Sequence, residues 1–199
     1  MKEVKLEVVK RGLIIVDMVN GFVKEGALAD PTIKEIIDEN VRLAKEFMES
    51  EDPVMAFRDA HTAESTEFDS FPPHCLEGSA ESELIDELKE LGDYIKVINK
   101  NSTSGMFAPG FVDYINSMGK LSEVVITGCC TDICIINLAI PLKNFFNQAN
   151  KAIEVIVPEN AVATYHIDDV HDRDQYTDMS FKLMAQAGIK LVKQYGGKK

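Results

Sequence analysis

The stretch VVITGCCTDICIINLAI, residues 124–140, decides the fold because it carries a buried strand directly into a helix. It begins inside an apolar run at 123–128 that predicts a strand, and residues from about 131 to 147 predict a helix. A strand that leads straight into a helix is typical of the units that build parallel sheets. Three of the chain's four cysteines lie at this junction.

The rest of the chain repeats this alternation of short apolar runs and amphipathic segments. Strands are predicted at residues 13–17, 53–59, 94–100, 123–128, within 152–163 and at 189–192. Helices are predicted at residues 33–50, 80–92, 109–120, about 131–147 and 178–188. The expected fold is one α/β domain over residues 1–199 with its core at about 12–193. It has three layers, α/β/α, built on a mainly parallel sheet of roughly six strands.

The composition restricts the partners of the protein. The chain has 199 residues, 45% of them hydrophobic, and a net charge of −12, so it can bury a core but lacks the basic character of nucleic-acid-binding proteins. The negative charge also disfavours anionic membrane surfaces, and the apolar runs are too short to span a bilayer. The first twelve residues carry scattered charges, which argues against a secretory signal. We therefore expect a cytoplasmic protein with reduced cysteines and with neither nucleic-acid nor membrane partners.

The clustered cysteines allow several interpretations, which their spacing separates. Cys130 and Cys134 do not match the paired units of structural zinc sites, and adjacent Cys129 and Cys130 cannot bridge each other without strain. Cys129 extends the strand and is expected in the core. Cys134 falls where the strand passes into the helix. There the helix dipole and unpaired N–H groups are expected to lower the pKa of its thiol and make it a nucleophile.

Reactive side chains follow four predicted strands at their carboxyl ends, where parallel sheets form binding sites. Asp17 ends the first strand, and Asp59 and His61 follow the second. Lys100 ends the third strand, and the cysteines follow the fourth. At one sheet edge, Asp17 can accept a proton from a nucleophilic Cys134 while Lys100 supplies a positive charge.

A second constellation lies in residues 57–79. Asp59 and His61 are two positions apart, which places both side chains on one side of an extended segment, and His74 follows the FPP turn. Imidazole and carboxylate donors together suit zinc, manganese or iron. The segment therefore predicts a site for one divalent metal ion.

These residues resemble the isochorismatase-like cysteine hydrolases, and among them the nicotinamidases. LIIVDMVNGFV resembles the first strand of the family with its catalytic aspartate, and VINKNSTSG resembles the strand that ends in the catalytic lysine. VVITGCCTDICI resembles the segment G-x-x-T-D-x-C, whose last cysteine is the nucleophile. The match covers about residues 12–193.

The resemblance implies a catalytic triad of Asp17, Lys100 and Cys134. The thiol would lose its proton to Asp17, attack an amide carbonyl and form a thioester, while Lys100 stabilises the charged groups. The backbone N–H groups of Cys130 and Cys134 would hold the oxyanion. A cis peptide bond between Cys129 and Cys130 is expected from the same resemblance.

The resemblance also completes the metal set and suggests the reaction. Some family members use a glutamate seven residues before the last histidine, which here is Glu67, with Glu64 and Asp69 as alternatives. The ion, expected to be zinc with manganese or iron as alternatives, would bind the ring nitrogen of the substrate. The implied reaction converts nicotinamide to nicotinate and ammonia in pyridine nucleotide salvage. The alternatives are hydrolysis of a carbamoyl or ureido amide, and an inactive binding module on the same fold.

Aromatic residues are expected to form the pocket for a flat ring amide. Phe22 and Phe71 match pocket aromatics of the family, and Phe107 is the first aromatic residue after Lys100. The resemblance also implies a homodimer or homotetramer. His166 and His171 have no counterpart in the family pattern, so the acidic stretch around them is expected to be a solvated loop or a subunit contact.

Overall fold

The structure is a computed structural model that describes residues 10–196. Residues 1–9 and the Lys-Lys end, which is predicted to be a frayed tail, lie outside this range. Seven strands form one sheet in the order β3-β2-β1-β4-β5-β7, with β6 paired to β4, and all the strand pairs are parallel. The strands are β1 Lys10–Val16, β2 Val54–Asp59, β3 Ile95–Lys100, β4 Leu121–Cys129, β5 Glu154–Pro158, β6 Val162–Ala163 and β7 Lys190–Val192.

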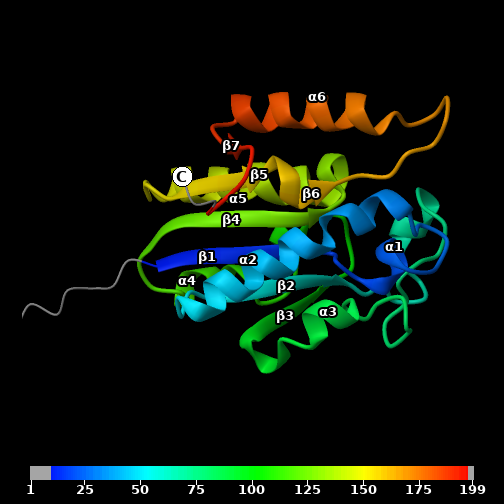
Figure 1. Cartoon of the computed structure of the whole chain (residues 1–199), viewed down its shortest axis with the longest axis horizontal. Helices are drawn as coiled ribbons and strands as arrows, with labels where there is room; N and C mark the ends of the chain where they lie inside the picture. The colour runs from blue at the N-terminus through cyan, green and yellow to red at the C-terminus, as the bar shows by residue number, and fades with distance from the viewer. Residues whose placement is uncertain (1–9, 197–199) are drawn as a thin grey trace, which may run out of the picture.

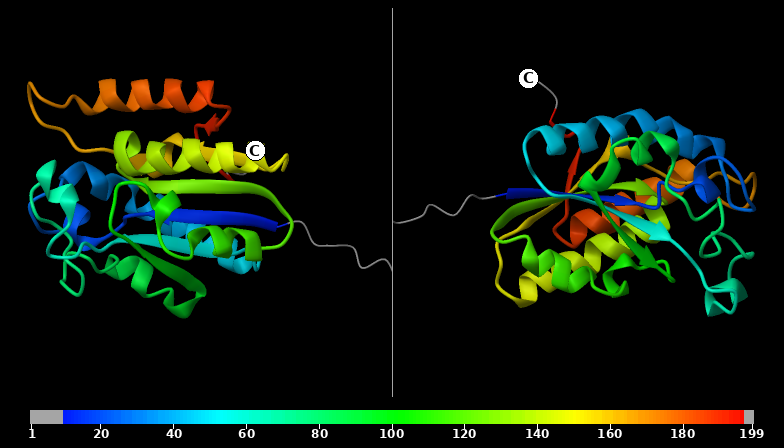
Figure 2. Two further views of the ribbon diagram at one scale, coloured as in Figure 1. Left: turned by 180° about the vertical axis from the view of Figure 1, so that it is seen from behind. Right: turned by 90° about the horizontal axis from the view of Figure 1, so that it is seen from below.

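Helices cover both faces of this sheet (Figures 1 and 2). The α-helices are α1 Asn20–Val23, α2 Ile37–Glu49, α3 Asp86–Lys89, α4 Phe111–Ser117, α5 Ile136–Gln148 and α6 Arg173–Gln186. Short 3-10 segments are η1 Pro31–Ile36, η2 Thr66–Asp69, η3 Gly92–Tyr94, η4 Gly105–Phe107 and η6 Glu159–Ala161. A π-helical turn, η5 Thr131–Ile135, precedes α5.

Alternate residues of β1 point to two separate hydrophobic cores, as expected for a sheet that is buried on both faces. Leu13 and Ile15 pack with α2 and α3 on one side. Ile14 and Val16 pack with α4, α5 and α6 on the other. The predicted three-layer parallel fold is therefore confirmed. The main strand order contains six strands, as expected, and β6 is the seventh.

The predicted helices differ in their bounds from those of the structure, and for two of them, at 80–92 and 178–188, specific contacts explain the difference. The helix expected at 80–92 is reduced to α3, because the segment before it pairs with the region around α1. The Glu81 carbonyl accepts a hydrogen bond from Gly21 N–H (2.8 Å), and Leu84 pairs with Val19 in an antiparallel bridge. The helix expected at 178–188 begins earlier, because the Asp172 side chain caps α6.

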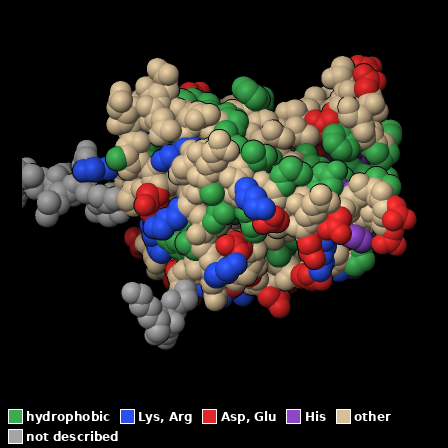
Figure 3. Space-filling model, turned by 90° about the horizontal axis from the view of Figure 1, so that it is seen from above, with side chains coloured by type: hydrophobic (Ala, Val, Ile, Leu, Met, Phe, Trp, Pro, Cys, Tyr) green, Lys and Arg blue, Asp and Glu red, His purple; other side chains and the backbone are tan. Residues whose placement is uncertain are grey.

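The carboxyl ends of the four strands β3, β2, β1 and β4 lie side by side, as the sequence indicates. Asp59 at the end of β2 is the register partner of Lys100 at the end of β3. Figure 3 shows acidic side chains gathered toward one end of the molecule, at the right of the view. No helix within residues 10–196 is long and apolar enough to cross a membrane.

Candidate active site

Three predicted catalytic side chains meet where these strands end. Lys100 Nζ lies 2.8 Å from Asp17 Oδ2 and 3.8 Å from Cys134 Sγ. All three residues are buried, with exposed fractions of 0% for Asp17, 2% for Lys100 and 7% for Cys134. The strand order explains this meeting, because Asp17 follows β1, Cys134 lies in the turn after the adjacent strand β4, and Lys100 ends β3, which lies beyond β2 on the other side. The structure therefore brings the sequence-predicted triad together.

The backbone turns sharply at Asp17. Its φ angle is +52°, a left-handed conformation that a residue other than glycine adopts only where its surroundings hold it. The Asp17 N–H donates to the Phe57 carbonyl (3.2 Å), and the Asp17 carbonyl accepts a hydrogen bond from the Cys129 thiol (3.3 Å). Neighbouring strands thus fix the direction of the carboxylate.

Burial sets the acid–base properties of Asp17 and Lys100. Burial raises the pKa of Asp17 to about 6, while the positive charge of Lys100 acts in the opposite direction. Burial by itself would lower the pKa of Lys100, but the negative charges of Asp17 and Asp59 raise it well above its usual value. Lys100 is therefore a permanent cation between two carboxylates at neutral pH.

The thiol of Cys134 differs from the sequence-based prediction of a lowered pKa. Burial raises the pKa of Cys134 well above its usual value, and the carboxylates of Asp17 and Asp59 add to this effect. Lys100 acts against it but does not outweigh it. Burial is the largest cause of this shift. Cys134 therefore keeps its proton at rest and needs a base, and Asp17 is the adjacent group that can accept it.

The turn between β4 and α5 holds the three cysteines in different environments. Cys129 ends β4 fully buried, which confirms its predicted place in the core. The peptide bond between Cys129 and Cys130 is cis, as expected. The Cys130 carbonyl accepts hydrogen bonds from the N–H groups of Ile133 and Ile135, both at 3.1 Å, and the second bond gives the turn its π-helical form. Cys134 lies inside this turn.

The predicted metal ligands also converge. The donor atoms of Asp59, His61, Glu67 and His74 all lie within 4.8 Å of one another. His61 Nε2 lies 3.0 Å from Asp59 Oδ2 and 3.7 Å from Glu67 Oε1, and His74 Nε2 lies 3.2 Å from Asp59 Oδ2. The alternative ligands Glu64 and Asp69 are exposed and do not belong to this group.

The contacts behind these four side chains fit a divalent metal ion. His61 Nδ1 lies 3.0 Å from the Asn101 side-chain oxygen, and His74 Nδ1 lies 2.8 Å from the Pro72 carbonyl. These oxygens can only accept, so each Nδ1 can donate to its partner, and each Nε2 faces the centre of the group, where it could ligate an ion.

The two carboxylates are arranged in the same way. Asp59 Oδ1 accepts from Lys100 (2.9 Å) and Glu67 Oε2 accepts from the Thr103 N–H (2.9 Å), which leaves Oδ2 and Oε1 directed to the centre. Two imidazoles and two carboxylates form a donor set that suits zinc, manganese or iron.

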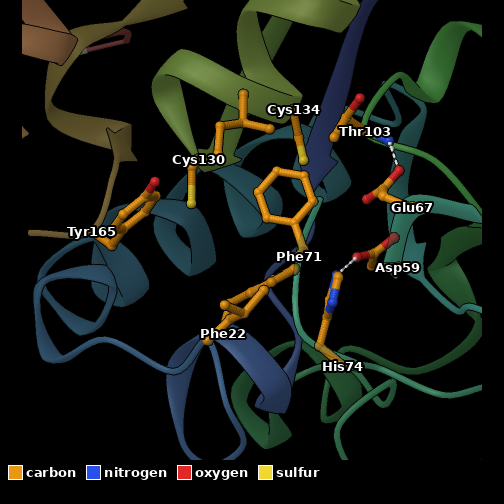
Figure 4. A pocket seen from close by; sticks show the side chains of 11 residues that line it. Phe22, Asp59, Glu67, Phe71, His74, Thr103, Cys130, Cys134 and Tyr165 are labelled. Carbon is orange, nitrogen blue, oxygen red and sulfur yellow. Dashed lines mark hydrogen bonds and ion pairs between the residues drawn. The ribbon is translucent and has the colours of Figure 1, made fainter. Parts of the chain in front are cut away.

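A pocket joins the metal-ligand group to Cys134 (Figure 4). The carboxylates of Asp59 and Glu67 lie on one side, and Cys130 and Tyr165 lie on the other. The Phe71 ring stands between them, below the Cys134 thiol. The lining residues are Phe22, Leu28, Asp59, Glu67, Phe71, His74, Thr103, Cys130, Ile133, Cys134 and Tyr165. Phe22 and Phe71 therefore occupy the predicted place.

Phe107 does not line this pocket, which corrects its predicted role. Its side chain is 78% exposed, because the 3-10 turn η4 directs it outward. Tyr165, Leu28 and Ile133 line the pocket instead, and the sequence motifs do not single them out. Tyr165 lies 31 residues beyond Cys134, so only the folded chain places it at the pocket.

The two remaining histidines differ from each other. His166 is exposed, as expected for a solvated loop, and pairs with Asp168 (3.1 Å). His171 is 5% exposed and pairs with Asp132 (2.8 Å) in the π-helical turn, so the prediction of a solvated loop is wrong for this residue.

Comparison with known proteins identifies the family. Residues 11–194 match the family described as Isochorismatase domain, and this match includes all the site residues named above. The chain belongs to the isochorismatase family. It is 33% identical to Nicotinamidase 1 of Arabidopsis thaliana over 174 residues, which cover 78% of this chain and 70% of that protein. This member of the isochorismatase family is therefore an amidohydrolase.

Solved structures share the fold. N-carbamoylsarcosine amidase from Thermoplasma acidophilum aligns with a TM-score of 0.75 at 25% identity, covering 95% of this chain and all of that one. A pyrazinamidase of Pyrococcus horikoshii, solved in complex with zinc, aligns with a TM-score of 0.75 at 23% identity, covering 92% of this chain and 98% of that one. Both structures align with this chain over nearly its whole length.

Proposed function

We propose that this protein is a metal-dependent nicotinamidase, which hydrolyses nicotinamide to nicotinate and ammonia. The observation that carries the proposal is the one pocket that is lined both by Cys134 and by Asp59, Glu67 and His74 of the metal-ligand group. In the proposed binding mode a flat ring lies among Phe22, Phe71 and Tyr165, with a ring nitrogen toward the metal-ligand group and an amide toward Cys134. The similarity to a plant nicotinamidase supports the same substrate.

The proposed mechanism uses the protonated thiol at rest. Asp17 accepts the Cys134 proton as the sulfur attacks the amide carbon, and the adjacent Lys100 stabilises the resulting negative charges. The backbone N–H groups of Cys130 and Cys134 stabilise the oxyanion. The proton on Asp17 then passes to the leaving nitrogen, ammonia departs, and water hydrolyses the thioester with Asp17 again as the base.

Asp59, His61, Glu67 and His74 would hold the divalent metal, and zinc is the ion that we propose. When bound, such an ion would supply a Lewis acid to which a ring nitrogen of the substrate could coordinate. Asp59 also contacts Lys100, so one carboxylate links the ligand group to the catalytic cation.

A carbamoyl or ureido amide is the alternative substrate, and the similarity to N-carbamoylsarcosine amidase supports it. Such compounds lack a ring nitrogen, so they give the four ligand residues no role in orienting the substrate. The metal-ligand group therefore favours the ring amide. The cytoplasmic location and the homodimer or homotetramer stay predictions.

Ammonia release from four amides tests the proposal. Nicotinamide and pyrazinamide carry a ring nitrogen, benzamide is the matched ring without one, and N-carbamoylsarcosine represents the alternative. We expect kcat/KM for nicotinamide to exceed that for benzamide by about 100-fold or more, and a chelator to remove this difference. A preference for N-carbamoylsarcosine that a chelator does not change would overturn the assignment.

Variants of two cysteines separate the roles of the sulfurs. Cys134→Ala removes the nucleophile and should abolish turnover of every amide. Cys130→Ala removes a pocket thiol but keeps the backbone N–H, so it should retain measurable turnover. Ammonia release by the Cys134→Ala variant at the wild-type rate would refute thioester chemistry.

A further inference from the structure

His171 connects a residue that lines the pocket to the turn η5, which contains Cys134. It contacts neither the metal ligands nor Cys134 itself. It lies in the segment between β6 and α6, which runs to one edge of the molecule and turns back into α6 (Figure 1). His171 Nε2 lies 2.8 Å from Asp132 Oδ2, and His171 Nδ1 lies 3.0 Å from the Tyr165 carbonyl. Tyr165 lines the pocket, and Asp132 lies two residues before Cys134.

The two partners of the ring fix its protonation state. A carboxylate and a carbonyl oxygen can only accept hydrogen bonds, so both ring nitrogens of His171 must donate. Only the imidazolium cation carries a proton on both nitrogens. A neutral ring would leave one buried nitrogen facing an oxygen without a proton between them, which is unfavourable at a residue that is 5% exposed.

The faces of the ring are also occupied. Tyr165 stacks on one side with its centroid 3.9 Å from that of His171, and Tyr176 of α6 also stacks at 3.9 Å. Aromatic faces attract cations, so this pair of rings favours the imidazolium over the neutral ring. Tyr165 is therefore held by its own carbonyl and by its ring.

Asp132 is held from two directions. Besides His171, the Thr164 hydroxyl donates to Asp132 Oδ1 at 2.5 Å. Asp132 belongs to η5, which contains Cys134 and directly follows Cys130, the other proposed oxyanion donor. Displacement of the Asp132 carboxylate would therefore shift η5 and with it Cys134.

We propose that His171, as an imidazolium, is a positioning residue. It connects Tyr165, which lines the pocket, to Asp132 in the turn η5 that contains the nucleophile Cys134. The ring stack holds Tyr165 and so acts on substrate binding. The pairing with Asp132 holds the turn and so acts on turnover. The kinetic part of this inference rests on the proposed function, whereas the protonation state does not.

Nitrogen NMR of the wild-type protein tests the protonation state without any substrate. With ¹⁵N-labelled histidine at pH 7, we expect two side-chain N–H signals for His171. The signals are assigned to His171 by their loss in the His171→Phe variant. Imidazole shifts of a neutral tautomer at this position would overturn the proposal. This result stands whether or not nicotinamide is the substrate.

Kinetics of three variants separate positioning from a general packing role. His171→Phe keeps the ring stack but loses both hydrogen bonds, so kcat should fall about tenfold while KM stays within about twofold. His171→Ala also loses the stack, so KM should rise by about tenfold as well. The matched control is His166→Gln, an exposed histidine of the same segment, which should keep both constants within about twofold of wild type. A His171→Phe variant with wild-type kcat would contradict the proposal.

A double-mutant cycle tests whether His171 acts through Asp132. Asp132→Asn should lower kcat by the same factor of about ten, and the double variant His171→Phe, Asp132→Asn should lose no more than either single variant. A loss of about 100-fold in the double variant would mean independent effects and would refute the link. Melting temperatures measured beside the kinetics show that each variant is folded under assay conditions.

Discussion

At the scale of single residues, burial distributes the protons of the site before any substrate binds. The pKa of Asp17 is raised to about 6 and that of Cys134 is raised well above its usual value. At pH 7 the carboxylate is therefore ionised and the thiol is protonated, which is the arrangement that proton transfer from sulfur to oxygen requires. Lys100 lies beside both groups, so it can stabilise the negative charge on either one.

This arrangement predicts a loss of activity in acid. Asp17 accepts a proton only when it is ionised, which is the case above its pKa of about 6. The value of kcat/KM should therefore fall about tenfold per pH unit below this point. Asp17→Asn should lower kcat/KM by about 100- to 10,000-fold at pH 7 and remove the acid limb. The measurement is a pH profile of ammonia release, and an unchanged acid limb in Asp17→Asn would assign it to another group.

Sequence reasoning succeeds for residues whose position is set by a strand end and fails for those set by the folding of a loop. Asp17, Lys100 and Cys134 could be placed because parallel strands bring their carboxyl ends to one edge. Phe107 and His171 could not, because exposure depends on how a turn directs each side chain. The spacing of Glu67 from His74 was informative only through the family pattern.

At the scale of elements, strands β1 and β4 approach so closely that one position admits only glycine. Gly128 has a φ angle of +109°, and a Cβ atom there would lie 2.0 Å from the Val16 carbonyl oxygen. This contact lies directly before Asp17 and Cys129, so the same close approach positions the base and the cysteine turn. The elements themselves were largely predictable, whereas the helix expected at 80–92 is shortened by pairing that local periodicity does not record.

Substitution at this position should therefore be costly. We expect Gly128→Ala to lower the free energy of unfolding by about 4 kcal/mol or more, because backbone rather than a flexible side chain blocks the new atom. The matched control is Gly119→Ala, which has a positive φ of +77° but open space around it and should cost only about 1–2 kcal/mol. Urea unfolding measures both variants, and equal costs would show that close approach plays no part.

At the scale of the whole molecule, the metal-ligand group connects the loop that follows β2 to the end of that strand. Asp59 ends β2, while His61, Glu67 and His74 lie in the loop that follows. An ion bound by all four side chains is bound only by the folded chain, so it should stabilise the fold as well as the pocket. The loop has little regular structure beyond a short 3-10 turn, so binding of the ion should account for a substantial part of the stability of the loop conformation.

Removal of the metal should accordingly lower the melting temperature. A free zinc concentration of 100 times Kd stabilises a folded protein by about 2.7 kcal/mol, which for a chain of this length corresponds to roughly 5–10 °C. We expect calorimetry to show this difference between zinc-loaded and chelator-treated protein. Glu67→Gln should strongly reduce this melting-temperature difference. The amide side chain of this variant can still accept a hydrogen bond from the Thr103 N–H, but it lacks the negative charge that binds the ion. Glu64→Gln, an exposed carboxylate of the same loop, should leave it intact, and an equal response of the two variants would place the ion elsewhere.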